Sequence, residues 1–177
     1  MEYFHHAEKY PNELTPTILE NGRITQLRVN KFTAQCYQDT GVLFDKRSSG
    51  WRPLVVNENE GGSKKSNHIQ AKAEDKIDDE ERLLARYMLS KRGQDLLAAC
   101  GLWCEDPRWC AEFAPNERHE GIDGQDKTGT WHYWVHFQIV PPGSGKRVYV
   151  PYNSKPITPP LKPWKPDGLT FEKTGYV

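Results

Sequence analysis

Ten residues decide the fold of this chain: Trp131-His132-Tyr133-Trp134-Val135-His136-Phe137-Gln138-Ile139-Val140. Successive side chains of an extended chain point to opposite faces, so this alternation with a period of two predicts a β-strand. One face of the strand is apolar and consists of Trp131, Tyr133, Val135, Phe137 and Ile139. The other face is polar and aromatic, with His132, Trp134, His136 and Gln138. We therefore expect the first face to lie in a core and the second to be partly in contact with solvent.

The length and composition of the chain limit the classes of protein to which it can belong. A chain of 177 residues can bury a core without disulfides or metal ions, so residues 1–177 are predicted to form a single domain. Its 24 lysines and arginines balance its 24 aspartates and glutamates, so the net charge gives no argument for nucleic acid or an anionic membrane as partner. No apolar run approaches the roughly 20 residues that span a bilayer, and residues 1–11 lack a secretory signal pattern. These features predict a cytoplasmic protein without a membrane partner, whose four cysteines are free thiols.

Strands of a mostly antiparallel sheet are the main elements that the sequence predicts. Besides residues 131–140, extended segments are expected at 23–37, 42–44, 51–56 and 146–150, and the last of these is expected to form a hairpin with 131–140. The one long helical pattern covers about 75–100, where apolar residues fall on one stripe, acidic residues stand near the start and basic residues follow. The prediction is an α+β fold, with about five strands packed on this main helix.

Two further segments have a composition that is not typical of a core. The polar segment at about 57–76 cannot bury enough apolar surface to order itself, and is expected to be flexible. Prolines recur from Pro151 to Pro166, so residues from about 151 to 177 are expected to form an irregular, extended, proline-rich C-terminal arm. This arm either packs on a surface or extends freely.

One group of residues has the chemistry of a zinc site, namely Cys100, Cys104, Cys110 and His119. Only Cys100 and Cys104 approach the close spacing of structural zinc ligands, and Cys100 also lies on the apolar stripe of the predicted helix. Ordinary packing of these thiols is therefore the favoured interpretation, with zinc as the one possible cofactor. His132 and His136 are separated by roughly 13 Å of extended chain and cannot share one ion.

A catalytic alternative rests on the turn at residues 118–132. It gathers His119, Glu120 and Asp123 just before the strand that carries His132. Carboxylates at a strand entry are typical of sites that hold metal ions for hydrolysis. This pattern predicts, as the alternative, a small metal-dependent hydrolase or nuclease of the effector or mobile-element type. The strand lacks the acidic residue and the lysine that such sites usually add, so a glycine-rich acidic turn is the commoner explanation.

The leading hypothesis is an intracellular, non-catalytic binding module. Residues 146–165 contain five basic residues and no acidic ones, next to the polar and aromatic face of the 131–140 strand. Aromatic and cationic side chains together can stack on bases or on peptide side chains, so the expected partner is a protein or a nucleic acid. The residues expected to contact it are His132, Trp134, His136, Gln138, Lys146, Arg147, Tyr149 and Tyr152.

Overall fold

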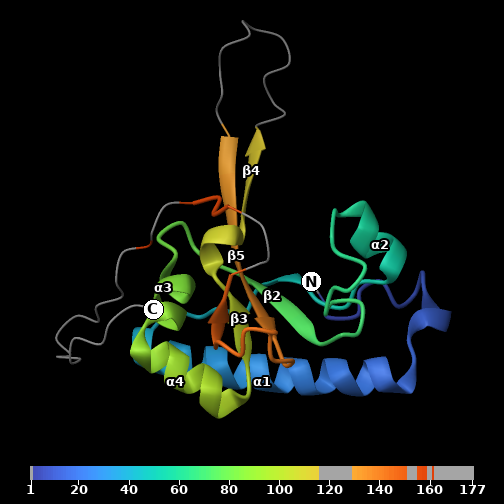
Figure 1. The fold of residues 1–177 in the computed structure, drawn as a ribbon, viewed down its shortest axis with the longest axis horizontal. Coiled ribbons are helices and arrows are strands. Elements are labelled where there is room, and N and C mark those ends of the chain that lie inside the picture. The colour runs from blue at the N-terminus through green and yellow to red at the C-terminus, as the bar shows by residue number, and fades with distance from the viewer. Residues whose placement is uncertain (1, 116–128, 151–154, 159–160, 162–177) are drawn as a thin grey trace, which may run out of the picture.

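The computed structural model describes residues 2–115, 129–150, 155–158 and 161 (Figure 1). Its α-helices are α1 (Pro16–Thr40), α2 (Leu54–Asn59), α3 (Leu83–Leu89) and α4 (Lys91–Cys100). Its strands are β1 (Arg47–Ser49), β2 (Ala73–Ile77), β3 (Trp103–Glu105), β4 (Ala111–Pro115), β5 (Gly129–Gln138) and β6 (Val148–Tyr149). Helices combined with a mixed sheet of six strands confirm the predicted α+β class.

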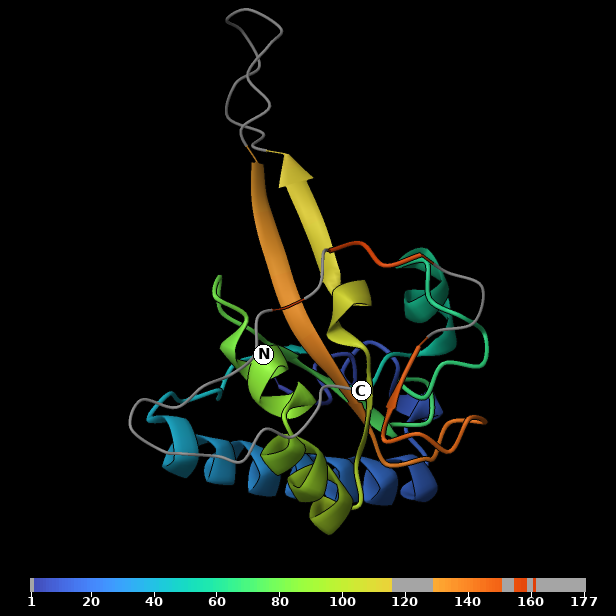
Figure 2. The same ribbon diagram turned by 60° about the vertical axis from the view of Figure 1, so that its left-hand side comes forward.

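The strand predicted at residues 131–140 is found as β5, which organises the sheet. The strand order is β1-β2-β5-β3-β6, and β4 pairs with β5 outside this path. The C-terminal half of β5 lies between β2 and β3, whereas its N-terminal half pairs with β4 alone. Figure 2 shows β4 and β5 projecting from the body as a two-stranded ribbon. All pairs are antiparallel except β3 with β6.

Helix α1 packs along one face of the sheet (Figure 1). It begins after Thr15, whose side-chain oxygen accepts a hydrogen bond from the backbone N–H of Ile18, and it ends at Gly41 in the left-handed conformation. Phe32 of α1 lies 5.2 Å, between ring centroids, from Phe137 of β5 in the main core. Because neighbouring strand residues alternate, His136 points to the opposite face of the sheet.

Several predicted elements are wrong, and α1 is the most instructive case. Residues 23–37, expected to be extended, lie inside α1. The side chains that α1 buries have helical spacing, but they include small and polar ones that weaken the apolar pattern: Ile18, Gly22, Thr25, Val29, Phe32, Thr33 and Cys36. The predicted hairpin of 131–140 with 146–150 is also wrong, because β3 lies between β5 and β6. Residues 51–56 are not a strand but lead into α2.

The predicted helix at about 75–100 is found as two helices preceded by a strand. β2 ends at Ile77, α3 follows, and α4 continues to Cys100 after a break at Ser90. Residues 57–76, predicted to be flexible, include the end of α2 and most of β2. Most of the predicted arm at 151–177 lies outside the described residues, and the single domain stays a prediction. The described helices include none with the length and hydrophobicity that a bilayer-spanning segment requires.

Candidate metal centre

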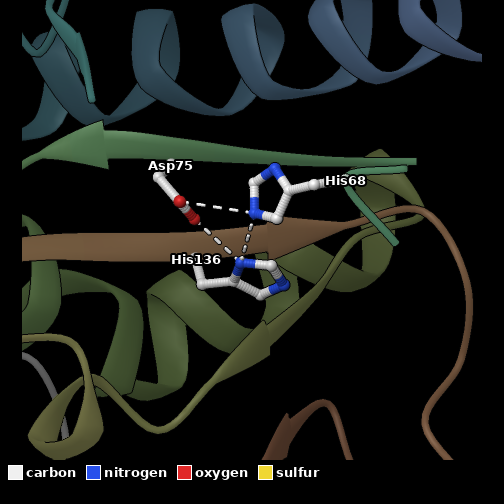
Figure 3. A group of neighbouring side chains, drawn as sticks. All are labelled: His68, Asp75 and His136. Carbon is white, nitrogen blue, oxygen red and sulfur yellow. Dashed lines mark hydrogen bonds and ion pairs between the residues drawn. The ribbon is translucent and has the colours of Figure 1, made fainter. Parts of the chain in front are cut away.

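Three side chains that can bind a metal converge on the face of the sheet opposite α1. His68 comes from the loop before β2, Asp75 from β2 and His136 from β5 (Figure 3). The Nδ1 atom of His136 lies 2.8 Å from Oδ1 of Asp75 and 3.2 Å from Nε2 of His68. Nε2 of His68 lies 3.3 Å from Oδ2 of Asp75. Among the described residues this is the one such group, with one ligand atom from each residue within 4.8 Å of the others.

Strand register explains why Asp75 and His136 meet. β2 and β5 run antiparallel, with Asp75 directly opposite His136. Opposed residues of neighbouring strands project to the same face, with Cβ atoms about 5 Å apart. The two residues are 61 positions apart in the sequence. The pairing of β2 with β5 therefore builds half of the site.

The loop that carries His68 is fixed to the N-terminal part of the fold. Ala71 takes a left-handed φ of 54°, which turns the chain between His68 and β2. This conformation costs a residue with a Cβ atom roughly 1 to 2 kcal/mol. The carbonyl of Ala71 accepts hydrogen bonds from the hydroxyls of Tyr3 at 2.7 Å and Thr25 at 2.9 Å, which stabilise the turn.

A backbone carbonyl sets the orientation of the His68 ring. Nδ1 of His68 lies 2.7 Å from the carbonyl oxygen of Gly50. A carbonyl oxygen can only accept, so Nδ1 carries the proton. In the neutral ring Nε2 then has a free lone pair, and it points toward Asp75 and His136. Histidine ligands of metals are commonly oriented in this way, by a hydrogen bond from the other ring nitrogen.

The pKa values of the three groups reflect their coupling. Burial disfavours the charged form of Asp75, but the neighbouring His68 and His136 outweigh this effect and hold the pKa of Asp75 below its ordinary value. Burial lowers the pKa of His68. For His136, burial is outweighed by the hydrogen bond with Asp75 and by the charges of Asp75 and Glu105, so its pKa is raised. Asp75 is therefore a carboxylate, and His136 is the imidazole that holds a proton more readily.

Gln138 connects the site to neighbouring elements. Its Oε1 atom accepts hydrogen bonds from Nδ2 of Asn67 at 3.0 Å and from the hydroxyl of Tyr149 at 2.8 Å. Its amide nitrogen donates to the carbonyl of Val140 at 2.6 Å. Asn67 precedes His68 in the loop, so Gln138 joins this loop to β5 and β6.

The donor set fits zinc. Two imidazole nitrogens and one carboxylate oxygen are zinc ligands, and catalytic zinc sites use three protein ligands with a fourth position left for water or substrate. Without a cation, two nitrogens and two carboxylate oxygens crowd together in a buried place. A divalent ion could bind one atom of each residue, namely the two nitrogens and one carboxylate oxygen.

The structure places the predicted partner-binding residues in different environments. His136 is a member of the site and Gln138 supports it, whereas His132 is exposed on the projecting part of β5. Trp134 is half-buried opposite Ile77 of β2. The other described members are Lys146, which is exposed, Arg147, which donates to the Leu102 carbonyl and lies over the Trp103 ring, and Tyr149, which is half-buried. Tyr152 lies outside the described residues.

The predicted zinc thiols are not part of the site. Cys100, Cys104 and Cys110 are buried free cysteines. Burial raises the pKa of the Cys104 and Cys110 thiols well above the ordinary value, which keeps them protonated. His119, and with it Glu120 and Asp123 of the catalytic alternative, lies outside the described residues.

Sequence reasoning missed His68 and Asp75. Both lie in the polar segment at 57–76 that was expected to be flexible. A signal was present, because His68 and Asp75 are two potential metal ligands seven residues apart, the first in the loop before β2 and the second within β2. The pair became a candidate metal site only in the folded chain, where β5 adds His136 as a third potential ligand.

One comparison with known proteins gives a match. The sequence model of a family described as Peptidase M15 matches residues 28–102, which is less than half of the chain. The matched part contains His68 and Asp75, while His136 lies beyond it. No curated protein and no solved structure matches the chain.

This match corrects the functional prediction. A peptidase family is a family of enzymes, so the prediction of a non-catalytic binding module is wrong. The alternative, a metal-dependent hydrolase, is supported better. The residues that could hold the metal ion of such an enzyme are His68, Asp75 and His136.

Proposed function

We propose that this chain is a zinc-dependent peptidase. The observation that carries the proposal is the convergence of His68, Asp75 and His136 within 4.8 Å. The family match supports it, since Peptidase M15 proteins are typically zinc-dependent. The match and the geometry are partly independent, because the fold supplies His136 from outside the matched residues.

The three residues would each hold zinc through one atom. Nε2 of His68 and Nδ1 of His136 provide imidazole nitrogens, and Asp75 provides a carboxylate oxygen. When bound, zinc would supply Lewis acidity, which polarises a peptide carbonyl and makes water a better nucleophile. The fixed His68 ring and the β2–β5 pairing keep the ligands in position before the metal arrives, so little ordering is required on binding.

Arg52 adds a positive charge beside the ligands. Its Nη1 atom donates to Oε2 of Glu60 at 2.6 Å, and its Nη2 atom lies 3.9 Å from Oδ2 of Asp75. The Nε atom is buried and, among the described residues, has no hydrogen-bond partner. The guanidinium, held by Glu60 beside Asp75, is suited to stabilise negative charge that develops at the site.

Zinc binding by the purified full chain tests the proposal. We expect metal-stripped protein to take up about one zinc per chain, as measured by plasma mass spectrometry, and to cleave peptides in a synthetic mixture analysed by mass spectrometry. His136→Ala should lose both properties. The matched control is His132→Ala, because His132 lies on the same face of β5 but is exposed and outside the group. Equal zinc binding by the wild type and His136→Ala would contradict the proposal.

A further inference from the structure

Two separate hydrophobic clusters support the proposed zinc ligands. His136 lies on β5 between two residues of the main core, Val135 and Phe137. The smaller cluster has four buried members: Tyr3, Ile18, Trp51 and Ala71. This cluster includes residues from the chain before α2 and from the turn after His68. The sheet ligands are therefore attached to the main core, and His68 is attached to the smaller cluster.

The chain that leads into α2 holds His68 and its loop. Nδ1 of His68 lies 2.7 Å from the carbonyl oxygen of Gly50, and the backbone N–H of Arg52 donates to the His68 carbonyl at 3.3 Å. The indole nitrogen of Trp51 donates to the carbonyl of Ile69 at 3.1 Å. The direction of the His68 ring therefore follows the position of this chain.

Tyr3 connects the segments on both sides of His68. Its carbonyl accepts a hydrogen bond from the backbone N–H of Trp51 at 2.9 Å. Its hydroxyl lies 2.7 Å from the carbonyl oxygen of Ala71 and 2.9 Å from that of Ala73. Burial raises the pKa of Tyr3, so the hydroxyl keeps the proton that it donates to these carbonyls. One side chain and its backbone thus join the chain before α2, the turn after His68 and the start of β2.

Two glycines make room for the N-terminal segment, residues 2–10. A Cβ atom at Gly22 of α1 would collide with the ring of Phe4 and would lie 2.8 Å from the ring of Tyr3. A Cβ atom at Gly50 would lie 2.5 Å from the carbonyl oxygen of Tyr3. Only a residue without a side chain allows so close an approach. The N-terminal segment therefore has a fitted place against α1 and against the chain that orients His68.

We infer that the N-terminal segment sets the zinc affinity and that Tyr3 is a positioning residue for His68, an inference that rests on the proposed function. A cluster with few buried residues opens at a lower free-energy cost than a main core. When it opens, His68 loses its support, while Asp75 and His136 stay paired in the sheet. Zinc then keeps two fixed ligands instead of three and dissociates more readily. Because such coupling is reciprocal, bound zinc holds the N-terminal segment closed by the same factor.

The first test compares two buried tyrosine hydroxyls in the full chain. Tyr3→Phe removes the hydroxyl near His68, and the matched control Tyr87→Phe removes one that donates to Asp39 at 2.6 Å, outside the metal group. Zinc affinity is measured by chelator competition below the unfolding transition. We expect Tyr3→Phe to bind zinc about tenfold more weakly than the wild type, as residues that orient a ligand do. Tyr87→Phe should stay within about threefold of the wild type.

A second pair of variants displaces the N-terminal segment without changing a hydrogen-bonding group. Gly22→Ala adds a methyl group where Phe4 and Tyr3 pack, whereas Gly143→Ala adds one in open space. Alanine is a better helix former than glycine, so Gly22→Ala favours α1 itself. We expect weaker zinc binding by Gly22→Ala, by about tenfold, and wild-type binding by Gly143→Ala.

Two spectroscopic readouts distinguish positioning from general stability. The visible absorption of the protein loaded with cobalt(II) depends on the number and geometry of the ligands. The spectrum of Tyr3→Phe should shift toward that of His68→Ala, while Tyr87→Phe keeps the wild-type spectrum. In the wild type, the Trp51 amide that bonds to Tyr3 should exchange hydrogen at least about tenfold more slowly with zinc than with EDTA.

The outcomes separate this inference from the proposed function. Wild-type zinc affinity and an unchanged cobalt spectrum in Tyr3→Phe would overturn the positioning role and leave the peptidase proposal intact. Equal losses of zinc affinity in Tyr3→Phe and Tyr87→Phe would also overturn it, because Tyr3 would then act only through overall stability. If the wild type binds no zinc, the proposed function fails, and the coupling to the N-terminal segment fails with it.

Discussion

Asp75 and Asp78 are both buried carboxylates, three residues apart at the end of β2, and their surroundings are opposite in kind. Asp78 is surrounded by donors. Its Oδ2 atom accepts from Nε of Arg82 at 3.3 Å, and its two oxygens accept from the backbone N–H groups of Asp79, Leu84 and Ala85. These bonds connect the end of β2 to the start of α3. Asp78 is therefore a structural carboxylate.

Asp75 is surrounded mainly by ring nitrogens that can become acceptors. His68 directs the unprotonated Nε2 of its neutral ring at Asp75, and the ring nitrogen of His136 beside it can lose its proton. Burial raises the pKa of Asp78 to about 6, although Arg82 and backbone donors work against this, whereas the histidines hold the pKa of Asp75 low. A buried carboxylate that accepts hydrogen bonds from fixed donors, such as Asp78, therefore supports the fold. A buried carboxylate next to imidazole nitrogens that can lose their protons, such as Asp75, is suited to bind a cation.

The largest expected effect comes from removing the charge of Asp75, which tests its assignment to metal binding. We expect Asp75→Asn to weaken zinc binding by at least about 100-fold, because even residues that only support a ligand contribute about 10- to 100-fold. The stability of the metal-free protein at pH 8 should change by less than about 1 kcal/mol, since His136 can release its proton when its partner is removed. Chelator competition and thermal unfolding measure the two quantities. A large loss of stability with unchanged zinc affinity would reverse the assignment of Asp75.

Asp78→Ala is expected to have the opposite profile. It leaves Nε of Arg82 and three backbone N–H groups without their acceptor in a buried place. The expected loss of stability is about 3 kcal/mol, or roughly 6 to 12 °C in melting temperature for a chain of this size. Zinc affinity, measured below the unfolding transition, should stay within a few-fold of the wild type. Weak zinc binding by the folded variant would show that the two carboxylates are not separable.

The elements that the sequence predicted correctly are those with a clear local pattern of apolar and polar residues. β5 was predicted because bulky apolar and polar side chains alternate along it over ten residues. α1 was missed because Gly22, Thr25 and Thr33 occupy buried positions where an apolar stripe would show. The sequence also predicted that His136 lies on the polar face of this strand. In the structure, His136 belongs to the candidate metal group and His132 does not.

The remaining site could not be predicted because it depends on contacts between distant segments. Which strand lies opposite His136 is set by the β2–β5 register, over 61 residues of chain, and no local pattern encodes it. His68 also depends on the Gly50 carbonyl and on the turn at Ala71. The cysteines attracted attention because thiols are strong zinc ligands, but burial in an apolar setting is the ordinary state of such residues.

Zinc itself should stabilise the fold through Asp75 and leave the Asp78 region dependent on its own hydrogen bonds. At a free zinc concentration about 100 times the dissociation constant, binding adds about 2.7 kcal/mol to the free energy of unfolding. For a chain of this size, that corresponds to roughly 5 to 10 °C in melting temperature. Differential scanning calorimetry with zinc and with EDTA measures the shift. Asp78→Ala should gain the same increment from its lower starting point, and Asp75→Asn should gain almost none.

The smallest expected effect concerns Gln138, which supports the ligands without being one of them. Gln138→Leu removes the acceptor of Asn67 and Tyr149 and the amide that bonds to the Val140 carbonyl, while it leaves all three ligands in place. We expect zinc affinity to fall about tenfold, because the loop that carries His68 loses its link to β5. Tyr149→Phe removes only one of these hydrogen bonds and serves as the graded control, with an expected loss of about threefold or less. If Gln138→Leu binds zinc as tightly as the wild type, the Gly50 carbonyl and the turn at Ala71 are sufficient to hold His68 in position.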